Sequence, residues 1–339
     1  MTLPDAQGAS DTFDAFEQSP SSASIENLQQ DFRSGQFVHA YLFFGPGGVG
    51  KRTLANLCAR TLYCRGGKGG QLPCGACVEC VRIAHGNHPD VFHVRPERSI
   101  GVEAIRSLIG EIQLRAFGAG HKAVVIEQAD RMTHQAQNCL LRTLEDPPPG
   151  TVFLLTAGSA DAMLPTLRSR CRLVAVAPLP DAAVERRLAA HGVPKDRAAL
   201  LAPLAQGSVG AALRMQQDEG YWPLRERVLR ALFEQTGSAA LQAAAELKEE
   251  RARSEQVLEI AEAALGDAVR AACQPPARGR REYPEAWQAF ACRAPMQAKL
   301  RLMQCVARCK RMLSSNVSFQ SVLETLVINI AEEYAACRW

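Results

Sequence analysis

The sequence predicts a domain of α/β class with a parallel sheet, followed by a region built only of helices. Up to about residue 178, short apolar runs alternate with stretches of helical spacing, as in a sheet covered on both faces. A glycine-rich turn follows the first apolar run, and beyond Pro180 every periodic stretch has the spacing of a helix. We therefore expect a flexible leader at 1–24, the sheet domain at 25–178 with an insertion at 64–80, a helical lid at 179–216 and an all-α domain at 217–339.

The predicted strands are short apolar runs at 38–44, 91–95, 122–126, 151–156 and 173–176. The helices predicted between them have apolar residues on one face and cover 25–34, 52–63, 101–116 and 133–144. Pro147 to Pro149 end the last of these helices, because proline cannot continue its hydrogen bonding. In the second half we expect helices at 181–191, 195–204, 209–216, 222–235, 238–249, 254–273, 284–292, 295–313 and 318–335, with a loop at 274–282.

The composition is that of an ordinary globular protein, with 47% hydrophobic and 22% charged residues. The net charge of +4 and the 6% aromatic content argue against a protein that binds nucleic acid by itself. No apolar run is long enough for a membrane span, and the leader lacks the basic start and apolar stretch of a secretory signal. We therefore expect a cytoplasmic protein without a membrane partner.

The glycine-rich turn has the pattern of a phosphate-binding loop. Its glycines are Gly45, Gly47, Gly48 and Gly50, and Lys51 follows them at the start of a predicted helix. Such a loop points backbone N–H groups at phosphates, and the lysine reaches the outer ones. The next position normally holds a Ser or Thr that binds Mg²⁺, but here it is Arg52. Thr53 comes one residue late, which turns its hydroxyl about 100° away on a helix.

A second departure follows the predicted strand at 122–126. Domains of this type usually carry Asp-Glu there, the Asp for Mg²⁺ and the Glu for the attacking water. This chain has Glu127 and Gln128, and glutamine cannot act as a base. We predict that the chain has no ATPase activity of its own. The sequence leaves open whether ATP still binds, and whether the changes compensate one another in a working hydrolase.

Four of the twelve cysteines lie within seventeen positions, at Cys64, Cys74, Cys77 and Cys80. Short spacings let several thiolates converge on one tetrahedral ion, and Zn²⁺ prefers such a set. With all four positions filled by protein, the zinc would be structural rather than catalytic. Free or paired thiols and an iron–sulfur cluster are the alternatives.

An arginine-containing turn, Leu164 to Cys171, follows the strand at 151–156. Arg170 in this turn could act as an arginine finger on the γ-phosphate held by a neighbouring subunit. Alternatively, it is a surface arginine paired with a carboxylate.

In these motifs and their order, residues 25–215 resemble the bacterial clamp-loader AAA+ family. The matching stretches are His39 to Leu42, Gly45 to Lys51, the four cysteines, Asn87 to Asp90, Ala129 to Met132, Asn138 to Pro147 and Ser169 to Cys171. The motor subunit of that family would keep Lys-Thr in the loop and Asp-Glu on the second strand. Arg52, Glu127 and Gln128 depart from that pattern. The stretch Gly207 to Gly210 also lacks the arginine that the motor carries.

The resemblance implies a subunit of a bacterial DNA polymerase holoenzyme that helps load a ring-shaped sliding clamp onto primed DNA. Its partners would be motor (gamma/tau) and delta subunits, joined through a collar formed by the C-terminal all-α domains. Arg170 would then serve the ATP of an adjacent motor subunit. Two other interpretations stay open: an ATPase motor subunit with unusual residues, and a zinc-dependent DNA-binding protein unrelated to clamp loading.

Overall fold

The computed structural model of the chain describes residues 13–16, 19–66, 72–113, 120–234, 242, 245–273, 283–315 and 317–337. The chain divides into two compact units. The first comprises residues 1–184 and 207–211, and the second comprises 185–206 and 212–339. Each unit is described by itself below.

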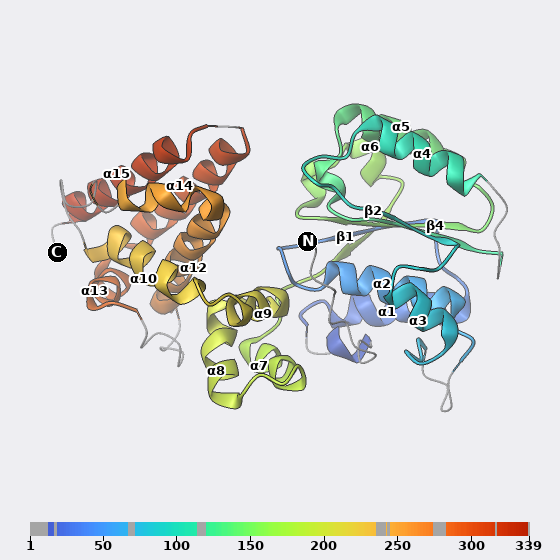
Figure 1. Cartoon of the computed structure of the whole chain (residues 1–339), viewed down its shortest axis with the longest axis horizontal. Helices are drawn as coiled ribbons and strands as arrows, with labels where there is room; N and C mark the ends of the chain where they lie inside the picture. Colours follow the sequence, from blue (N-terminus) through green and yellow to red (C-terminus); the bar gives the residue numbers. More distant parts are fainter. Residues whose placement is uncertain are drawn as a thin grey trace. The chain divides into compact units, whose positions relative to one another are not determined.

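The first unit is built on a five-stranded sheet in the order β2-β3-β4-β1-β5 (Figure 1). All strand pairs are parallel. The strands are β1 (Ala40–Phe44), β2 (Val91–Val94), β3 (Lys122–Ile126), β4 (Thr151–Ala157) and β5 (Arg172–Ala175). This confirms the predicted α/β class and all five predicted strands to within two residues at each end.

Helices cover both faces of this sheet, because strand side chains alternate between the faces (Figure 1). Tyr41 and Phe43 of β1 belong to one apolar core, whereas Leu42 belongs to the other. The helices on the Tyr41 side are α1 (Ser22–Ser34), α2 (Lys51–Tyr63) and α3 (Val78–Ala84). Those on the Leu42 side are α4 (Val102–Ile112), α5 (His134–Glu145) and α6 (Pro165–Arg168).

The expected leader at 1–24 differs from the structure where the structure describes it. Phe13 and Phe16 lie in a short 3-10 turn, and they are only 4% and 1% exposed. Both pack into the core beside α1, which begins at Ser22. Two aromatic rings buried in this way are not part of a flexible segment, because their burial removes a large apolar area from water. Residues 1–12 and 17–18 lie outside the described residues.

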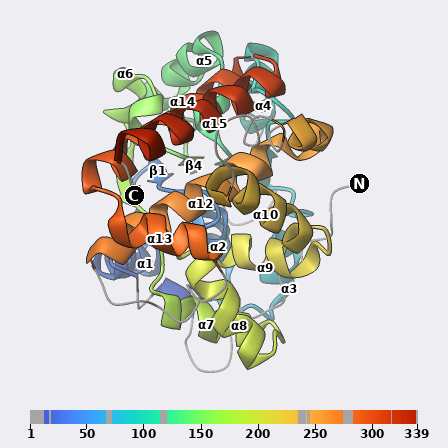
Figure 2. The same cartoon turned by 90° about the vertical axis from the view of Figure 1, so that its left-hand side faces the viewer.

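The described residues of the second unit form helices and no strand. Trp287, Phe290 and Val306 are among the fully buried residues of its single apolar core. The long helices α12 (Ser254–Cys273), α14 (Met296–Ser314) and α15 (Phe319–Cys337) carry much of that core (Figure 2). The remaining helices are α7 (Asp181–Ala190), α8 (Lys195–Leu204), α9 (Val209–Gln217), α10 (Tyr221–Leu229) and α13 (Glu285–Arg293), with α7 and α9 crossing the unit boundary.

Most helices predicted in this half match the structure to within two residues. At the expected helix 238–249, the structure describes a 3-10 segment at Leu247–Arg253, while residues 235–241 and 243–244 lie outside the description. The expected loop at 274–282 also lies outside it. None of the described helices combines the length and the apolar character that crossing a bilayer requires.

Candidate nucleotide, metal and arginine sites

The glycine-rich loop joins β1 to α2 at the carboxyl end of the sheet, as a phosphate loop does. Gly45, Gly48 and Gly50 have positive φ angles of 150°, 74° and 96°. A Cβ atom on Gly45 would lie 2.2 Å from the Val176 carbonyl oxygen, and one on Gly48 would lie 2.1 Å from Ser208 Oγ. Glycine is therefore required at both positions by the backbone angle and by the space. Around Gly47, by contrast, a Cβ would meet nothing within 4 Å.

Lys51 points back onto its own loop. Its Nζ donates to the carbonyl oxygen of Gly45 at 2.6 Å and to that of Pro46 at 2.5 Å. Burial lowers the pKa of Lys51, and the nearby Asp130 carboxylate opposes that shift. The ammonium group that would bind phosphate thus has acceptors within the loop itself.

Glu127, which the sequence predicts at the Mg²⁺-binding position, is held by two arginines. Its Oε1 lies 3.1 Å from Arg52 Nε and 2.7 Å from Arg95 Nε. The Glu127 side chain is only 14% exposed, so these contacts are largely shielded from water. This carboxylate oxygen accepts a hydrogen bond from Arg95 and forms an ion pair with Arg52. It is poorly placed to bind a divalent cation, because the cation and the guanidinium groups would repel one another.

Two other predicted residues complete this edge of the sheet. Gln128 adopts a left-handed conformation (φ 49°, ψ 52°), and its backbone N–H donates to Thr156 Oγ1 at 3.0 Å. Thr53 is the third residue of α2 and is half-buried. Its hydroxyl therefore belongs to the helix, one position after the residue that would bind Mg²⁺. Neither residue supplies a base at the position of the missing glutamate.

Sequence reasoning missed three polar residues here. Arg95 follows β2, and it reaches Glu127 because β2 and β3 are neighbours in the sheet. Asp130 accepts from the Gly158 N–H at 2.9 Å and lies near Lys51. His93, whose pKa is lowered to about 4 by burial and by the charges of Arg95 and Arg52, points to the same face. All three residues lie within a few positions of the carboxyl end of a strand, which is where functional groups lie in parallel sheets. This position in the sequence is the signal that could have found them.

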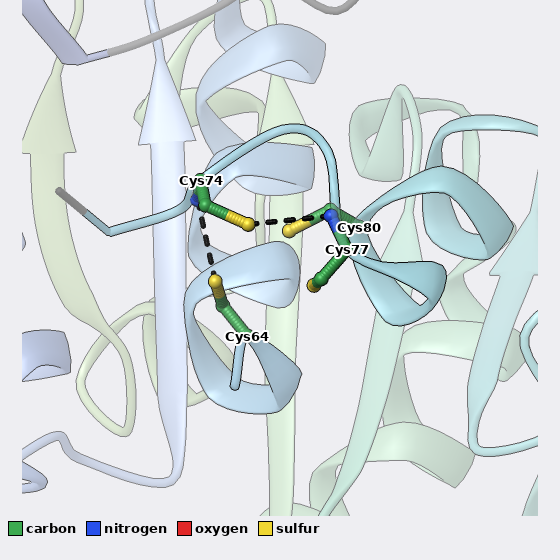
Figure 3. A group of neighbouring side chains, drawn as sticks. All are labelled: Cys64, Cys74, Cys77 and Cys80. Atoms are coloured by element: carbon green, nitrogen blue, oxygen red, sulfur yellow. Dashed lines mark hydrogen bonds between the residues drawn. The ribbon is translucent and has the colours of Figure 1, made fainter. Parts of the chain in front are cut away.

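The four cysteines predicted to bind metal converge in the structure (Figure 3). Their sulfur atoms all lie within 4.8 Å of one another. In a tetrahedral zinc site with Zn–S bonds of about 2.3 Å, the sulfurs are about 3.8 Å apart. The cluster is therefore close to the geometry that zinc requires, and four sulfur donors suit that ion.

Backbone groups around the cluster favour thiolates. The N–H of Cys74 lies 3.2 Å from Cys64 Sγ, and the N–H of Cys77 lies 3.3 Å from Cys74 Sγ. Hydrogen bonds from the N–H groups of Ala76 and Cys77 lower the pKa of Cys74 to about 6. Burial has the opposite effect on Cys80 and raises its pKa. These residues can hold Zn²⁺ as a structural ion, with no position left for a substrate.

A buried histidine attaches the cysteine segment to the sheet. His88 Nε2 lies 3.3 Å from Glu79 Oε2 on α3, and the Asp90 N–H donates to His88 Nδ1 at 3.1 Å. The His88 ring also contacts the Tyr63 ring, with centroids 4.2 Å apart. Burial lowers the pKa of His88. Through His88, the cysteine segment is thus connected to Tyr63 at the end of α2 and to Asp90 directly before β2.

Arg170 follows α6 in a turn anchored by Leu167 and Cys171, which are 0% and 9% exposed. The Arg170 side chain is 36% exposed and forms an ion pair with Glu145, in which Nη2 lies 2.6 Å from Oε1. Its Nη1 donates to the Thr166 carbonyl oxygen at 2.9 Å. The guanidinium group is thus at the surface and paired with a carboxylate, as the alternative interpretation expects, and its role as an arginine finger stays a prediction.

A glycine-rich phosphate loop after the first strand of a parallel, helix-covered sheet defines a P-loop ATPase type of domain. Within that class, residues 21–180 match the sequence model of the family described as DNA polymerase III, delta subunit. Over these residues the chain is similar to a subunit of bacterial DNA polymerase III.

The individual relatives are delta-prime and tau/gamma subunits of DNA polymerase III. The delta-prime subunit of Pseudomonas aeruginosa DNA polymerase III is 39% identical over 189 residues, which are 55% of this chain and 57% of that protein. The delta-prime subunit of Bacillus subtilis is 29% identical over 315 residues, 90% of this chain and 94% of that protein. The tau/gamma subunit of Haemophilus influenzae is 32% identical over 197 residues, 56% of this chain and 28% of that protein. The Bacillus subtilis delta-prime match extends over 90% of the chain, whereas the Haemophilus influenzae tau/gamma match covers 56% of it.

Proposed function

We propose that the chain is a non-hydrolysing, delta-prime-like subunit of a DNA polymerase III clamp loader. In this role it assembles with motor (gamma/tau) and delta subunits and helps load the sliding clamp onto primed DNA during replication. The similarity to delta-prime subunits supports the family, and the contacts at the phosphate loop support the absence of hydrolysis. As part of the replication machinery, the chain would work in the cytoplasm.

The arrangement around Glu127 carries the proposal. Hydrolysis in P-loop proteins needs Mg²⁺ held by a loop hydroxyl and a strand carboxylate, together with a residue that orients water. Here the hydroxyl is replaced by Arg52, the carboxylate of Glu127 is bound to Arg52 and Arg95, and Gln128 replaces the base. The Gly45–Lys51 loop keeps the glycines and the lysine of a phosphate loop, so the proposal includes ATP binding without hydrolysis, which a binding measurement tests.

Arg170 is the residue that we expect to act in hydrolysis, on the ATP of an adjacent motor subunit. A half-exposed guanidinium group at the surface of the sheet domain can reach a phosphate that another chain holds, and an arginine finger stabilises the charge of the transition state. The chain then contributes to ATP turnover without an active site of its own.

The other parts have structural roles in this proposal. The four cysteines hold Zn²⁺ and form a knuckle within the sheet domain. Residues 179–216 act as the lid, and residues 217–339 form the oligomerisation domain that joins the collar. The helices that the structure describes in the second unit support the helical character of both regions.

The alternative is a gamma/tau-like motor subunit, which the preserved glycines and Lys51 favour. Steady-state ATPase measurement on the purified chain separates the two. We expect no turnover above a Lys51→Ala variant, with or without primed DNA, and co-purification with motor and delta subunits. Mg²⁺-dependent turnover that Lys51→Ala removes would support the motor instead.

A further inference from the structure

We infer that Glu145 is a positioning residue for Arg170. The inference rests on the proposed role of Arg170 and extends it to a second residue on a different helix. Glu145 is the last residue of α5, and its Oε1 lies 2.6 Å from Arg170 Nη2, across 25 positions of sequence.

The location of Glu145 is unfavourable for its own helix. The carboxyl end of a helix carries partial negative charge, so an acidic residue there destabilises the helix. In α5 the glutamate is followed by Asp146 at the C-cap, which adds a second negative charge at the same end. Local helix stability therefore does not explain a glutamate at this position, whereas a contact with Arg170 does.

Glu145 acts together with the backbone of the turn. Arg170 Nη1 donates to the Thr166 carbonyl oxygen at 2.9 Å and lies 3.4 Å from Ser169 Oγ. Ser169 Oγ donates to the same Thr166 carbonyl at 2.9 Å. Contacts to both terminal nitrogens of the guanidinium group, from α5 and from α6, fix the plane of the group as well as its position.

Such a constraint matters for an arginine that must meet a phosphate on another chain. A free arginine side chain samples many rotamers, and part of that conformational entropy is lost whenever the guanidinium group is fixed in place. If contacts within this chain already fix the Arg170 side chain, it loses less conformational entropy when the neighbour's ATP reaches its transition state. The Glu145 side chain is 47% exposed, so a stronger phosphate partner can take over its contact at low cost.

The same turn contains a matched control. Arg168, two residues before Arg170, pairs with Asp161 in the short 3-10 segment Ala160–Ala162. Asp161→Ala therefore removes an exposed arginine–carboxylate contact of the same kind from the same turn without touching Arg170.

The test uses the assembled loader with its motor and delta subunits and compares steady-state ATP turnover on primed DNA. With Glu145→Ala we expect kcat to fall about threefold with the KM for ATP unchanged, because the contact orients a group that acts in the transition state. The kcat of Glu145→Gln, which keeps one acceptor oxygen, should lie between the values for Glu145→Ala and wild type. Asp161→Ala should match wild type. Adding Glu145→Ala to Arg170→Ala should cause no further loss.

The outcomes separate this inference from the proposed function. If Arg170→Ala lowers turnover while Glu145→Ala equals or exceeds wild type, Glu145 does not position the arginine and the inference is wrong. An equal loss from Glu145→Ala with and without Arg170 also overturns it, because the effect is then structural. If Arg170→Ala itself has no effect, the proposed role of Arg170 fails first.

Discussion

The sheet domain contains two arginine–glutamate contacts with opposite consequences. At the phosphate loop, Arg52 and Arg95 share one oxygen of Glu127, whose side chain is 14% exposed. At the arginine turn, Arg170 has Glu145 to itself, and the two side chains are 36% and 47% exposed. The first contact uses up a carboxylate that would bind metal. The second holds a guanidinium group at the surface. The same kind of ion pair therefore blocks metal binding at the phosphate loop and exposes Arg170 at the turn.

We expect the largest effect on stability from the cysteine cluster. The cluster stabilises the fold of the sheet domain, and the contact of Glu127 with Arg52 and Arg95 depends on that fold. Cys80, buried at 1% exposure, lies on α3, which His88 ties to β2. Removing zinc with a chelator, or substituting Cys80→Ser, should lower the free energy of unfolding by about 3 kcal/mol or more. Urea denaturation with zinc analysis measures this.

Cys292→Ser is the control, since Cys292 is an exposed thiol of the second unit and its loss should change nothing. A zinc-free protein as stable as the untreated one would mean that the cluster has no structural role.

The pH dependence of stability should reveal how well Arg52 and Arg95, the two arginines that contact Glu127, are shielded from water. The pKa of His93 is about 4 in the folded chain, because of burial and the charges of Arg95 and Arg52, against about 6.5 when unfolded. Between these values the unfolded chain binds a proton that the folded chain does not. The folded state therefore loses stability as the pH falls from about 6.5 to about 4, by about 3 kcal/mol in all.

Replacing His93 by asparagine should remove that part of the acid destabilisation. The fall in the free energy of unfolding from pH 7 to pH 4.5 should be about 2 kcal/mol smaller in His93→Asn than in wild type. Equal pH dependence in the two proteins would show that His93 does not remain neutral beside the arginines.

The smallest effects come from breaking the two ion pairs directly. Glu127→Gln removes the negative charge that both Arg52 and Arg95 contact, and it should lower the free energy of unfolding by about 2 kcal/mol. Glu145→Gln affects an exposed pair and should cost less than about 1 kcal/mol. Urea denaturation of both variants gives the comparison. A larger loss from Glu145→Gln would reverse our account of which pair is structural.

How far the sequence predicts these sites depends on the distance along the chain between the interacting residues. The strands, the loop glycines and the four cysteines are recognisable because their signals lie within about twenty positions. Arg95 and Glu127 are brought together by the order of strands in the sheet, which a single sequence does not reveal. The sequence places Phe13 and Phe16 in a leader, because their polar neighbours outweigh two aromatic residues in composition. The Glu145 contact required knowing where α5 ends relative to the turn.

ATP turnover by the assembled loader with wild-type or Arg170→Ala chain tests the central claim most directly, alongside the isolated chain. We expect no turnover by either isolated protein, and lower turnover in the loader that contains Arg170→Ala, at unchanged assembly and zinc content. An arginine finger contributes about 10³-fold or more to its own site, so turnover at that boundary should be nearly lost while other boundaries continue. Equal turnover by the two loaders, or Mg²⁺-dependent turnover by the isolated chain, would contradict the account.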